Sequence, residues 1–283
     1  MKKYINYLRR FLFKIKNIVK LVDSMKTTIK VLKKIKPNNP ILIEGLPGIG
    51  YVGRIAAQYL IEKLGAEKIA ELYSPYFFPF VVLHGPVGNV LKNEFYYWKN
   101  PKGRDLIILI GDSQCSDASP KGYYDIAEKI LDFCEELGVK EIFTLGGFGS
   151  GEIEDMKDIE VLGAVTHEEL VEKYEKYGID FRSSSQRVGM IVGATGLLLG
   201  LGKERGMKGV CLMGETTGYP IITDPRAAEK ILKPLIKILD IDVDLSELDK
   251  KAKEVQNFLS KLEKLQEKAL EKMMKKEKAG KKN

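Results

Sequence analysis

The sequence predicts an α/β protein, built as a three-layer sandwich with a mostly parallel central sheet and a C-terminal helical extension. Short β-branched runs closed by glycine recur along the chain, as is typical of strands buried on both faces. Segments with apolar residues at helical spacing follow several of these runs, and this alternation is the pattern of βαβ units. The clearest runs are residues 40–45, 105–111, 140–145 and 208–214. A chain of 283 residues is long enough for one such domain, which we expect over residues 25–244.

The composition favours a globular protein of a reducing compartment. The chain is 44% hydrophobic and 30% charged, and no apolar run reaches the roughly 20 residues that a membrane-spanning helix needs. The chain has three cysteines, Cys115, Cys134 and Cys211, and no two of them form a C-x-x-C motif. This count indicates small buried side chains rather than disulfides or a zinc site. We therefore expect a cytoplasmic protein without a membrane partner.

The net charge of +7 is distributed unevenly along the chain. Residues 1–36 hold twelve Lys or Arg and one Asp, and residues 250–283 hold twelve Lys and five Glu. The body between these two basic ends therefore carries a net charge of −11. A nucleic-acid-binding domain is expected to carry its basic surface on the folded body, so no nucleic-acid partner is expected. The basic ends could still contact an acidic partner or surface.

Residues 1–24 form a basic, amphipathic extension. Lysines and arginines interrupt its apolar residues and no small-residue cleavage site follows, which does not fit a signal peptide. One interpretation is a helix that lies on a membrane surface. The other, which we favour, is that Met25 is the native start and that the fold does not need the extension. The apolar residues at three- or four-residue steps are Tyr4, Leu8, Phe11, Ile15, Ile18 and Val22.

Residues 40–54 are the segment around which the predicted fold is organised. Residues 40–45 are an apolar run bounded by turn residues, which predicts a buried strand. From Tyr51 to Leu64 the apolar residues fall at helical spacing, which predicts a helix. Strand, glycine turn and helix in this order are typical of the start of an α/β domain.

The turn in this segment contains a G-x-G-x-x-G motif at Gly48, Gly50 and Gly53. This spacing fits a dinucleotide-binding loop, and Glu71 lies about where an acidic ribose partner is expected. The alternative is that the glycines let the helix pack closely against the strand. We favour packing, because the chain has only two histidines and no obvious hydride-transfer constellation. Both histidines, His84 and His167, are expected to be structural.

The region before residue 100 predicts further strands. Residues 27–32 predict an edge strand, because lysines alternate with apolar residues. Residues 68–73 predict another strand. Two hairpin-like strands joined through Gly85 and the Gly88-Asn89 pair are expected over residues 74–98. The aromatic side chains of this region belong either to the core or to a subunit interface, where such residues are enriched. The candidates are Phe77, Phe78, Phe80, Phe95, Tyr97 and Trp98.

Residues 105–145 predict a right-handed βαβ crossover. Ser119 is expected to cap its helix and Pro120 to be the first helical residue. Loops 111–118 and 146–151 then follow the carboxyl ends of two strands that we expect to be adjacent and parallel. This edge of an α/β sheet is where ligands bind, and the glycines of loop 146–151 could expose N–H groups to an anion. Tight structural connections are the favoured alternative, because no general acid, base or metal cluster lies alongside.

The following segments predict the remaining elements of the domain. Residues 161–166 predict a strand, and Thr166 with Glu169 predicts a capping box for the next helix. Residues 189–205 predict an apolar helix dotted with glycine. Residues 208–214 predict the last central strand. Asp224 and Pro225 are expected to cap and begin a helix that ends near Leu239.

Residues 245–275 predict an amphipathic helix, and residues 276–283 a disordered basic tail. The apolar residues of this helix alternate by three and four, as in a coiled-coil seam. The helix either packs back on the body or projects as an arm that offers its apolar stripe to a partner. The stripe includes Val255, Leu259, Leu262 and Leu265.

Five motifs follow one another along residues 27–250. They are PILIEGLPGIGYVG (40–53), KNEFYYW (92–98), LGGFG (145–149), GATGLLLGLG (193–202) and LMGETTG (212–218). Together they resemble the archaeal proteasome-assembly-chaperone family. The resemblance implies a three-layer fold related to nucleoside phosphorylases and a homo-oligomer, for which we favour a tetramer. It also implies an ATP-independent chaperone, not an enzyme and without cofactor or metal, that binds proteasome α-subunits or other clients.

The resemblance further implies that C-terminal helices of the long type act as arms, with Val255, Leu259, Leu262 and Leu265 as candidate contacts. Some members dock through a C-terminal hydrophobic–tyrosine–any-residue tripeptide. This chain ends in Lys281-Lys282-Asn283. We therefore expect capture by the helix stripe rather than docking through that tripeptide.

Two other function classes remain as alternatives. A nucleotide- or nucleoside-binding enzyme would use the glycine loops and Glu215. Such a phosphorylase would need a cation for phosphate and a base. Only Arg187 and Arg205 are candidates for the cation. An adaptor at a membrane surface would use residues 1–24.

Overall fold

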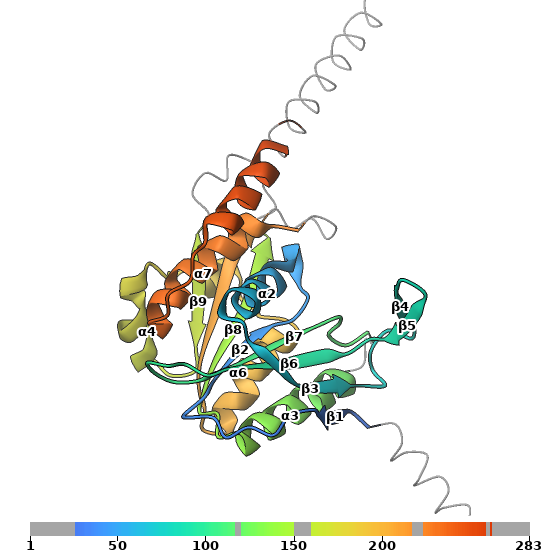
Figure 1. Cartoon of the computed structure of the whole chain (residues 1–283). Coiled ribbons are helices and arrows are strands. Elements are labelled where there is room, and N and C mark those ends of the chain that lie inside the picture. Colours follow the sequence, from blue (N-terminus) through green and yellow to red (C-terminus); the bar gives the residue numbers. More distant parts are fainter. Residues whose placement is uncertain (1–25, 117–119, 150–159, 217–222, 259–260, 262–283) are drawn as a thin grey trace, which may run out of the picture.

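Four parallel strands form the centre of the fold (Figure 1). The structure is a computed structural model that describes residues 26–116, 120–149, 160–216, 223–258 and 261. The central strands lie in the order β7, β2, β8 and β10, and each pairs in parallel with the next. Their bounds are Leu106–Gly111, Ile41–Gly45, Glu141–Gly149 and Lys208–Thr216. They are the four apolar runs that predicted the fold class, and all six residues of β7 are buried.

Antiparallel strands extend this centre on both sides into an eight-stranded mixed sheet of order β1-β3-β6-β7-β2-β8-β10-β9. The predicted parallel arrangement therefore holds for the centre of the sheet. The outer strands are β1 (Thr28–Val31), β3 (Glu67–Tyr73), β6 (Asn93–Trp98) and β9 (Val161–Val165). The strand at the β1 edge is exposed along most of its length, as its alternating lysines predict.

Helices cover both faces of the sheet and form the outer two layers of the sandwich. Ile41 and Ile43 of β2 point into the core beneath α2 and α7, whereas Leu42 between them points into the core beneath α3 and α6. This alternation follows from the two-residue period of a strand and explains why β2 is apolar on both faces. The four helices are α2 (Val52–Leu64), α7 (Pro225–Leu239), α3 (Pro120–Glu136) and α6 (Ala194–Glu204).

Shorter helices lie between these elements. Leu170 and Tyr174 of α4 join the core on the α2 and α7 face. The short helices are η1 (Ile49–Tyr51), α4 (Glu169–Tyr174), η2 (Glu175–Tyr177) and α5 (Ser184–Arg187).

The strand arrangement differs from the sequence prediction in two respects. The strands β7 and β8 are not neighbours, because β2 lies between them and pairs with both. The strand β8 also does not end at Leu145 but continues through Gly149. Its glycine-rich end pairs residue by residue with the end of β10, from Gly146 opposite Met213 to Gly149 opposite Thr216. A partner strand that continues the ladder thus overrides the turn tendency of glycine.

Two local predictions about helix starts are wrong. The hydroxyl oxygen of Thr166 does not cap α4. It accepts a hydrogen bond from the Gly209 N–H at 2.8 Å and extends the pairing of β9 with β10. The helix predicted from residue 189 begins only at Ala194, because Gly189 and Gly193 have positive φ angles of 70° and 77°.

The aromatic segment divides into a buried part and a protruding hairpin. Strands β4 (Val81–His84) and β5 (Val87–Val90) form a separate two-stranded sheet, which projects from the body in Figure 1. Gly85 and Pro86 make its turn. Gly85 has a φ of 60°, and proline cannot adopt a positive φ at the next position, which identifies a type II′ turn. The predicted Gly88-Asn89 connection is wrong, because both residues lie inside β5.

The six candidate interface aromatics differ in their burial. Phe77 and Phe95 are buried in the core, and Tyr97 and Trp98 of β6 are half-buried. The hydroxyl of Tyr97 donates to Asp105 at 2.8 Å. Phe78 and Phe80 are 50% and 55% exposed, and their rings stack with centroids 5.7 Å apart.

Residues 246–258 form a helix that packs on the body. Leu248 and Ala252 are buried, and the Tyr59 hydroxyl of α2 donates to the Asp244 carbonyl at 2.7 Å. Val255 is half-buried. The first turns of the predicted C-terminal helix therefore belong to the fold. Outside the described residues lie the predicted extension 1–24, the tail 276–283 and the stripe residues Leu259, Leu262 and Leu265.

Candidate functional site

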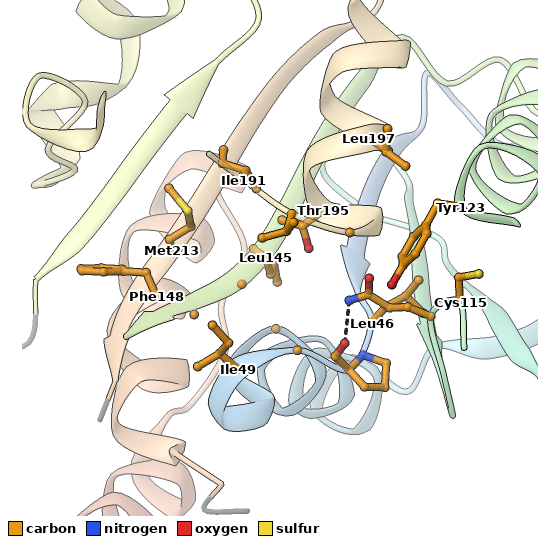
Figure 2. A pocket seen from close by; sticks show the side chains of 18 of the residues that line it. Leu46, Ile49, Cys115, Tyr123, Leu145, Phe148, Ile191, Thr195, Leu197 and Met213 are labelled. Carbon is orange, nitrogen blue, oxygen red and sulfur yellow. Dashed lines mark hydrogen bonds between the residues drawn. The ribbon is translucent and has the colours of Figure 1, made fainter. Parts of the chain in front are cut away.

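A pocket of about 880 Å³ opens at the carboxyl edge of the central strands (Figure 2). Residues 46–49 follow β2, residues 112–115 follow β7, and residues 146–149 end β8. The segment before α6 closes the remaining side. The structure thus brings together the loops after β7 and β8 that the sequence predicts at the ligand-binding edge. In Figure 2 the side chains of Ile49, Leu145, Thr195 and Met213 approach this space from four different elements.

Gln114 ties two walls of the pocket together. Its amide nitrogen donates to the Pro47 carbonyl at 2.6 Å, the dashed line in Figure 2. Its amide oxygen accepts from the Ala194 N–H at 2.9 Å, at the first residue of α6. One side chain from the loop after β7 therefore joins the loop after β2 to the start of α6.

The glycines of the G-x-G-x-x-G motif serve close packing. A Cβ on Gly53 would lie 2.1 Å from the Leu145 carbonyl oxygen, so α2 begins directly against the backbone of β8. Gly50 has a φ of 62°, and its carbonyl accepts from the Asp224 N–H at 2.8 Å. These contacts support the packing interpretation of the motif.

Glu71 is not placed as a ribose partner of this motif. It lies on β3, which is separated from β2 by β6 and β7. It forms an ion pair with Lys92, and the hydrogen bond from Lys92 lowers the pKa of the Glu71 carboxyl although burial acts in the opposite direction. The expected spacing along the sequence does not bring Glu71 close to the motif, because the chain passes from β2 through α2 to β3, which lies in the outer half of the sheet.

The rim of the pocket is apolar and exposed. Exposed fractions at the rim range from 42% for Tyr51 to 83% for Val192. The rim residues are Ile49, Tyr51, Phe78, Tyr124, Met190 and Val192. Water-exposed large apolar side chains that gather around one opening mark a surface that contacts another molecule.

The charged side chains that line the described part of the pocket are Asp112 and Arg187. Arg187 forms ion pairs with Glu160 and, at 3.3 Å, with Glu215, and its guanidinium lies over the Phe148 ring. Arg205, the other candidate cation, lies outside the pocket lining and forms ion pairs with three carboxylates of α3. The structure therefore brings only Arg187 to the predicted loops, where two carboxylates already neutralise it.

A buried carboxylate lies beneath the pocket floor. Glu44 of β2, Thr144 of β8 and Cys211 of β10 are aligned across three neighbouring strands. Glu44 accepts a hydrogen bond from the Leu46 N–H at 2.8 Å. Burial raises the pKa of the Glu44 carboxyl to about 7, and hydrogen bonds, the largest of them from Leu46, offset only part of this increase. Burial likewise raises the pKa of the Cys211 thiol to about 12.

Glu44 should make folding stability depend on pH. Between pH 4.5 and about 7 the folded protein holds a proton on Glu44 that the unfolded chain has released. Stability therefore falls as pH rises through this window. The variant Glu44→Gln does not titrate, so its free energy of unfolding should not fall with Glu44 ionisation. Its stability relative to wild type should therefore increase by up to about 3 kcal/mol from pH 5 to pH 8, at roughly 1.4 kcal/mol per pKa unit. Urea unfolding at both pH values measures the difference.

The matched control is Glu62→Gln, on the exposed side of α2. In this variant the free energy of unfolding should change between the two pH values by the same amount as in wild type. If Glu44→Gln showed the same pH dependence as wild type, Glu44 would not be the group responsible.

Sequence reasoning did not find several of these residues. The sequence predicts that Met190 and Val192 lie in a helix, although Gly189 and Gly193 on either side of them indicate a break. Glu44 was a signal too, since a charged residue stood inside an otherwise apolar strand. The sequence prediction that the three cysteines are buried is confirmed. The ring nitrogen Nδ1 of His167 forms a hydrogen bond with the Thr166 hydroxyl at 2.7 Å, outside the pocket lining.

Within the described residues, no helix has the length and apolarity that crossing a bilayer requires. In the same part of the chain, His, Cys, Asp and Glu side chains form no group of three that could bind a metal ion.

Comparison with known proteins gives concordant matches. The PAC2 family model matches residues 42–263. An uncharacterized protein of Methanocaldococcus jannaschii is 40% identical over 249 residues, which cover 87% of this chain and 92% of that protein. The crystal structure of Pyrococcus furiosus PbaB, an archaeal proteasome activator, has a TM-score of 0.78 at 46% identity over 84% of this chain and 99% of that one. P. furiosus PbaA, an archaeal homolog of proteasome-assembly chaperone, has a TM-score of 0.64 at 28% identity over 86% of this chain and 99% of that one.

Proposed function

Because the chain belongs to the PAC2 family, we propose that it is an ATP-independent chaperone that binds proteasome α-subunits or other client proteins. The proposal includes a cytoplasmic homo-oligomer, with a tetramer favoured, and a fold related to nucleoside phosphorylases. The similarity to PbaB and PbaA, whose descriptions refer to the proteasome, supports this class of partner.

One observation carries the proposal, namely the apolar rim of the pocket. Six large side chains that are each at least 42% exposed surround an opening whose charged lining residues, within the described chain, are Asp112 and Arg187. A substrate phosphate would need a cation that is free to bind it, whereas Arg187 is held by Glu160 and Glu215. An apolar segment of another protein fits this surface better than a charged metabolite does.

The C-terminal helix supplies a second candidate contact. Residues 246–258 are anchored on α2 and α7, which fixes the start of the helix on the body. We infer that the stripe of Val255, Leu259, Leu262 and Leu265 continues beyond this anchor as an arm for the partner. The half-buried Val255 lies where the anchored part gives way to the proposed arm.

The test is co-elution with proteasome α-subunits in size-exclusion chromatography with light scattering. The variant Met190→Asp/Val192→Asp places two charges on the rim and should weaken binding at least about tenfold, since truncated hot-spot residues commonly cost over 1.4 kcal/mol. Removal of residues 259–283 should also abolish co-elution. This cut spares Leu248 and Ala252, so it removes the proposed arm without exposing the core beneath it.

The matched control is Leu32→Asp. Leu32 is 46% exposed and follows the end of β1. Three successive antiparallel pairings connect β1 through β3 and β6 to β7, so β1 runs opposite to the central strands and Leu32 lies at their amino ends, away from the pocket. Its variant should bind like wild type. Unchanged binding by both the rim variant and the shortened chain would overturn the proposal.

A further inference from the structure

The hairpin of β4 and β5 is an exposed apolar surface in its own right. Its five large aliphatic side chains are between 36% and 67% exposed. They are Val81, Val82, Leu83, Val87 and Val90. The eighteen residues 74–91 contain no Asp, Glu, Lys or Arg. The charged side chains with which soluble proteins protect exposed strands are thus missing here.

The register of the hairpin divides its side chains between two faces. Val81 is opposite Val90, and Leu83 is opposite Gly88. Because side chains alternate along a strand, these four residues share one face. A Cβ added to Gly88 would be in ordinary van der Waals contact with Val81 at 3.5 Å and with Leu83 at 3.7 Å, so Gly88 leaves a slot between them with about the width of a methyl group. We call this surface the Leu83 face.

A hairpin of this kind needs a partner. An isolated two-stranded hairpin is at best marginally stable in water. In the described chain β4 and β5 pair only with each other, so their outer edges have no strand beside them. The stacked rings of Phe78 and Phe80 add two more exposed apolar groups at its base. Covering the Leu83 face would remove the side chains of Val81, Leu83 and Val90 from water.

Because the hairpin contains no Asp, Glu, Lys or Arg, it can accept a second copy of this chain as its partner. Residues 37–249 carry a net charge of −11, so two bodies repel each other over most of their surface. The hairpin projects from the body and is uncharged, so two copies can meet there without bringing the acidic bodies together (Figure 1). A two-fold arrangement needs a surface that fits itself, and Leu83 of each copy can enter the slot at Gly88 of the other.

We propose that the Leu83 face of one copy packs against the Leu83 face of a second copy. This contact gives a location to the self-association included in the proposed function and rests on it. It is distinct from the rim around the pocket, which remains available for a client protein.

The test compares Leu83→Asp with wild type by light scattering over a hundredfold range of protein concentration. A buried charge at the contact should shift the dissociation midpoint at least tenfold toward higher concentration. The control is Val87→Asp, which places the same charge on the opposite face of the hairpin, where Val87 is 57% exposed. It should keep the wild-type midpoint. Circular dichroism checks that all variants are folded.

A second measurement oxidises a mixture of the single variants Leu83→Cys and Gly88→Cys, because in one chain these two positions are opposite each other and their thiols could join within one hairpin. A covalent dimer that contains both variants should form at a rate well above that of wild type, whose three cysteines are buried. A wild-type mass for Leu83→Asp, or no covalent dimer, would overturn the inference. If Leu83→Asp keeps its mass and loses only α-subunit co-elution, the hairpin binds the client, and the proposed function survives without this contact. Loss of mass with co-elution retained supports the contact.

Discussion

Gly53→Ala should destabilise the fold by about 3 kcal/mol or more, at the upper end of the usual cost of overpacking. The added Cβ would lie 2.1 Å from the carbonyl oxygen and 2.8 Å from the carbonyl carbon of Leu145. Leu145 is fully buried in β8, whose neighbours on both sides are hydrogen bonded to it, so its backbone has no room to move. Helix α2 would have to shift away from the sheet. Urea unfolding followed by circular dichroism measures the change.

Gly200→Ala is the matched control for this substitution. Gly200 lies in α6 with nothing within 4 Å of an added Cβ. Its replacement should stabilise the protein by up to about 1 kcal/mol through helix propensity alone. If Gly53→Ala were as stable as wild type, the packing account of the G-x-G-x-x-G motif would be wrong, and the dinucleotide interpretation would have to be considered again.

Asp224→Ala should cost about 3 to 5 kcal/mol, the range for breaking one partner out of a buried ion pair. Asp224 is 1% exposed and accepts hydrogen bonds from the Arg226 guanidinium at 2.9 and 3.0 Å. It also accepts from the Thr216 hydroxyl and from the first N–H groups of α7. The substitution removes both the cap of α7 and the negative charge that faces a buried guanidinium. Thermal and urea unfolding measure the loss.

Two comparisons separate these contributions. Asp224→Asn keeps an oxygen that can cap α7 and should lose less than Asp224→Ala. Asp249→Ala breaks the Asp249–Lys253 pair, whose side chains are 41% and 72% exposed, and should cost well under 1 kcal/mol. If Asp224→Ala and Asp249→Ala lowered the free energy of unfolding equally, burial would not make the Asp224–Arg226 pair contribute more than an exposed pair.

The features that local chemistry determines were predictable from the sequence. The Asp224-Pro225 pair indicates a helix start, and the structure places the cap and the first residue there. The apolar runs closed by glycine become the four central strands. The pocket edge was predictable as well, because loops after parallel strands gather at one edge whatever the order of the strands.

Features that depend on long-range packing were not predictable. The insertion of β2 between β7 and β8 joins residues more than sixty positions apart, and no local signal encodes it. Phe77 and Phe78 are neighbours in the sequence beyond the end of β3, yet one is 5% and the other 50% exposed, because Phe77 packs into the core beneath α3 and α6 and Phe78 does not. The continuation of β8 through its glycines likewise depends on β10, which is distant in the sequence.

The position of Gln114 has a consequence for the entropy of partner binding. Its amide joins the loop after β2 to the first residue of α6, so the two walls keep their separation when nothing is bound. Ordering a loop or side chain at the moment of association costs roughly 0.5 to 1.5 kcal/mol for each mobile group. A partner that enters this pocket meets walls that are already in place, and more of its contact energy remains as affinity.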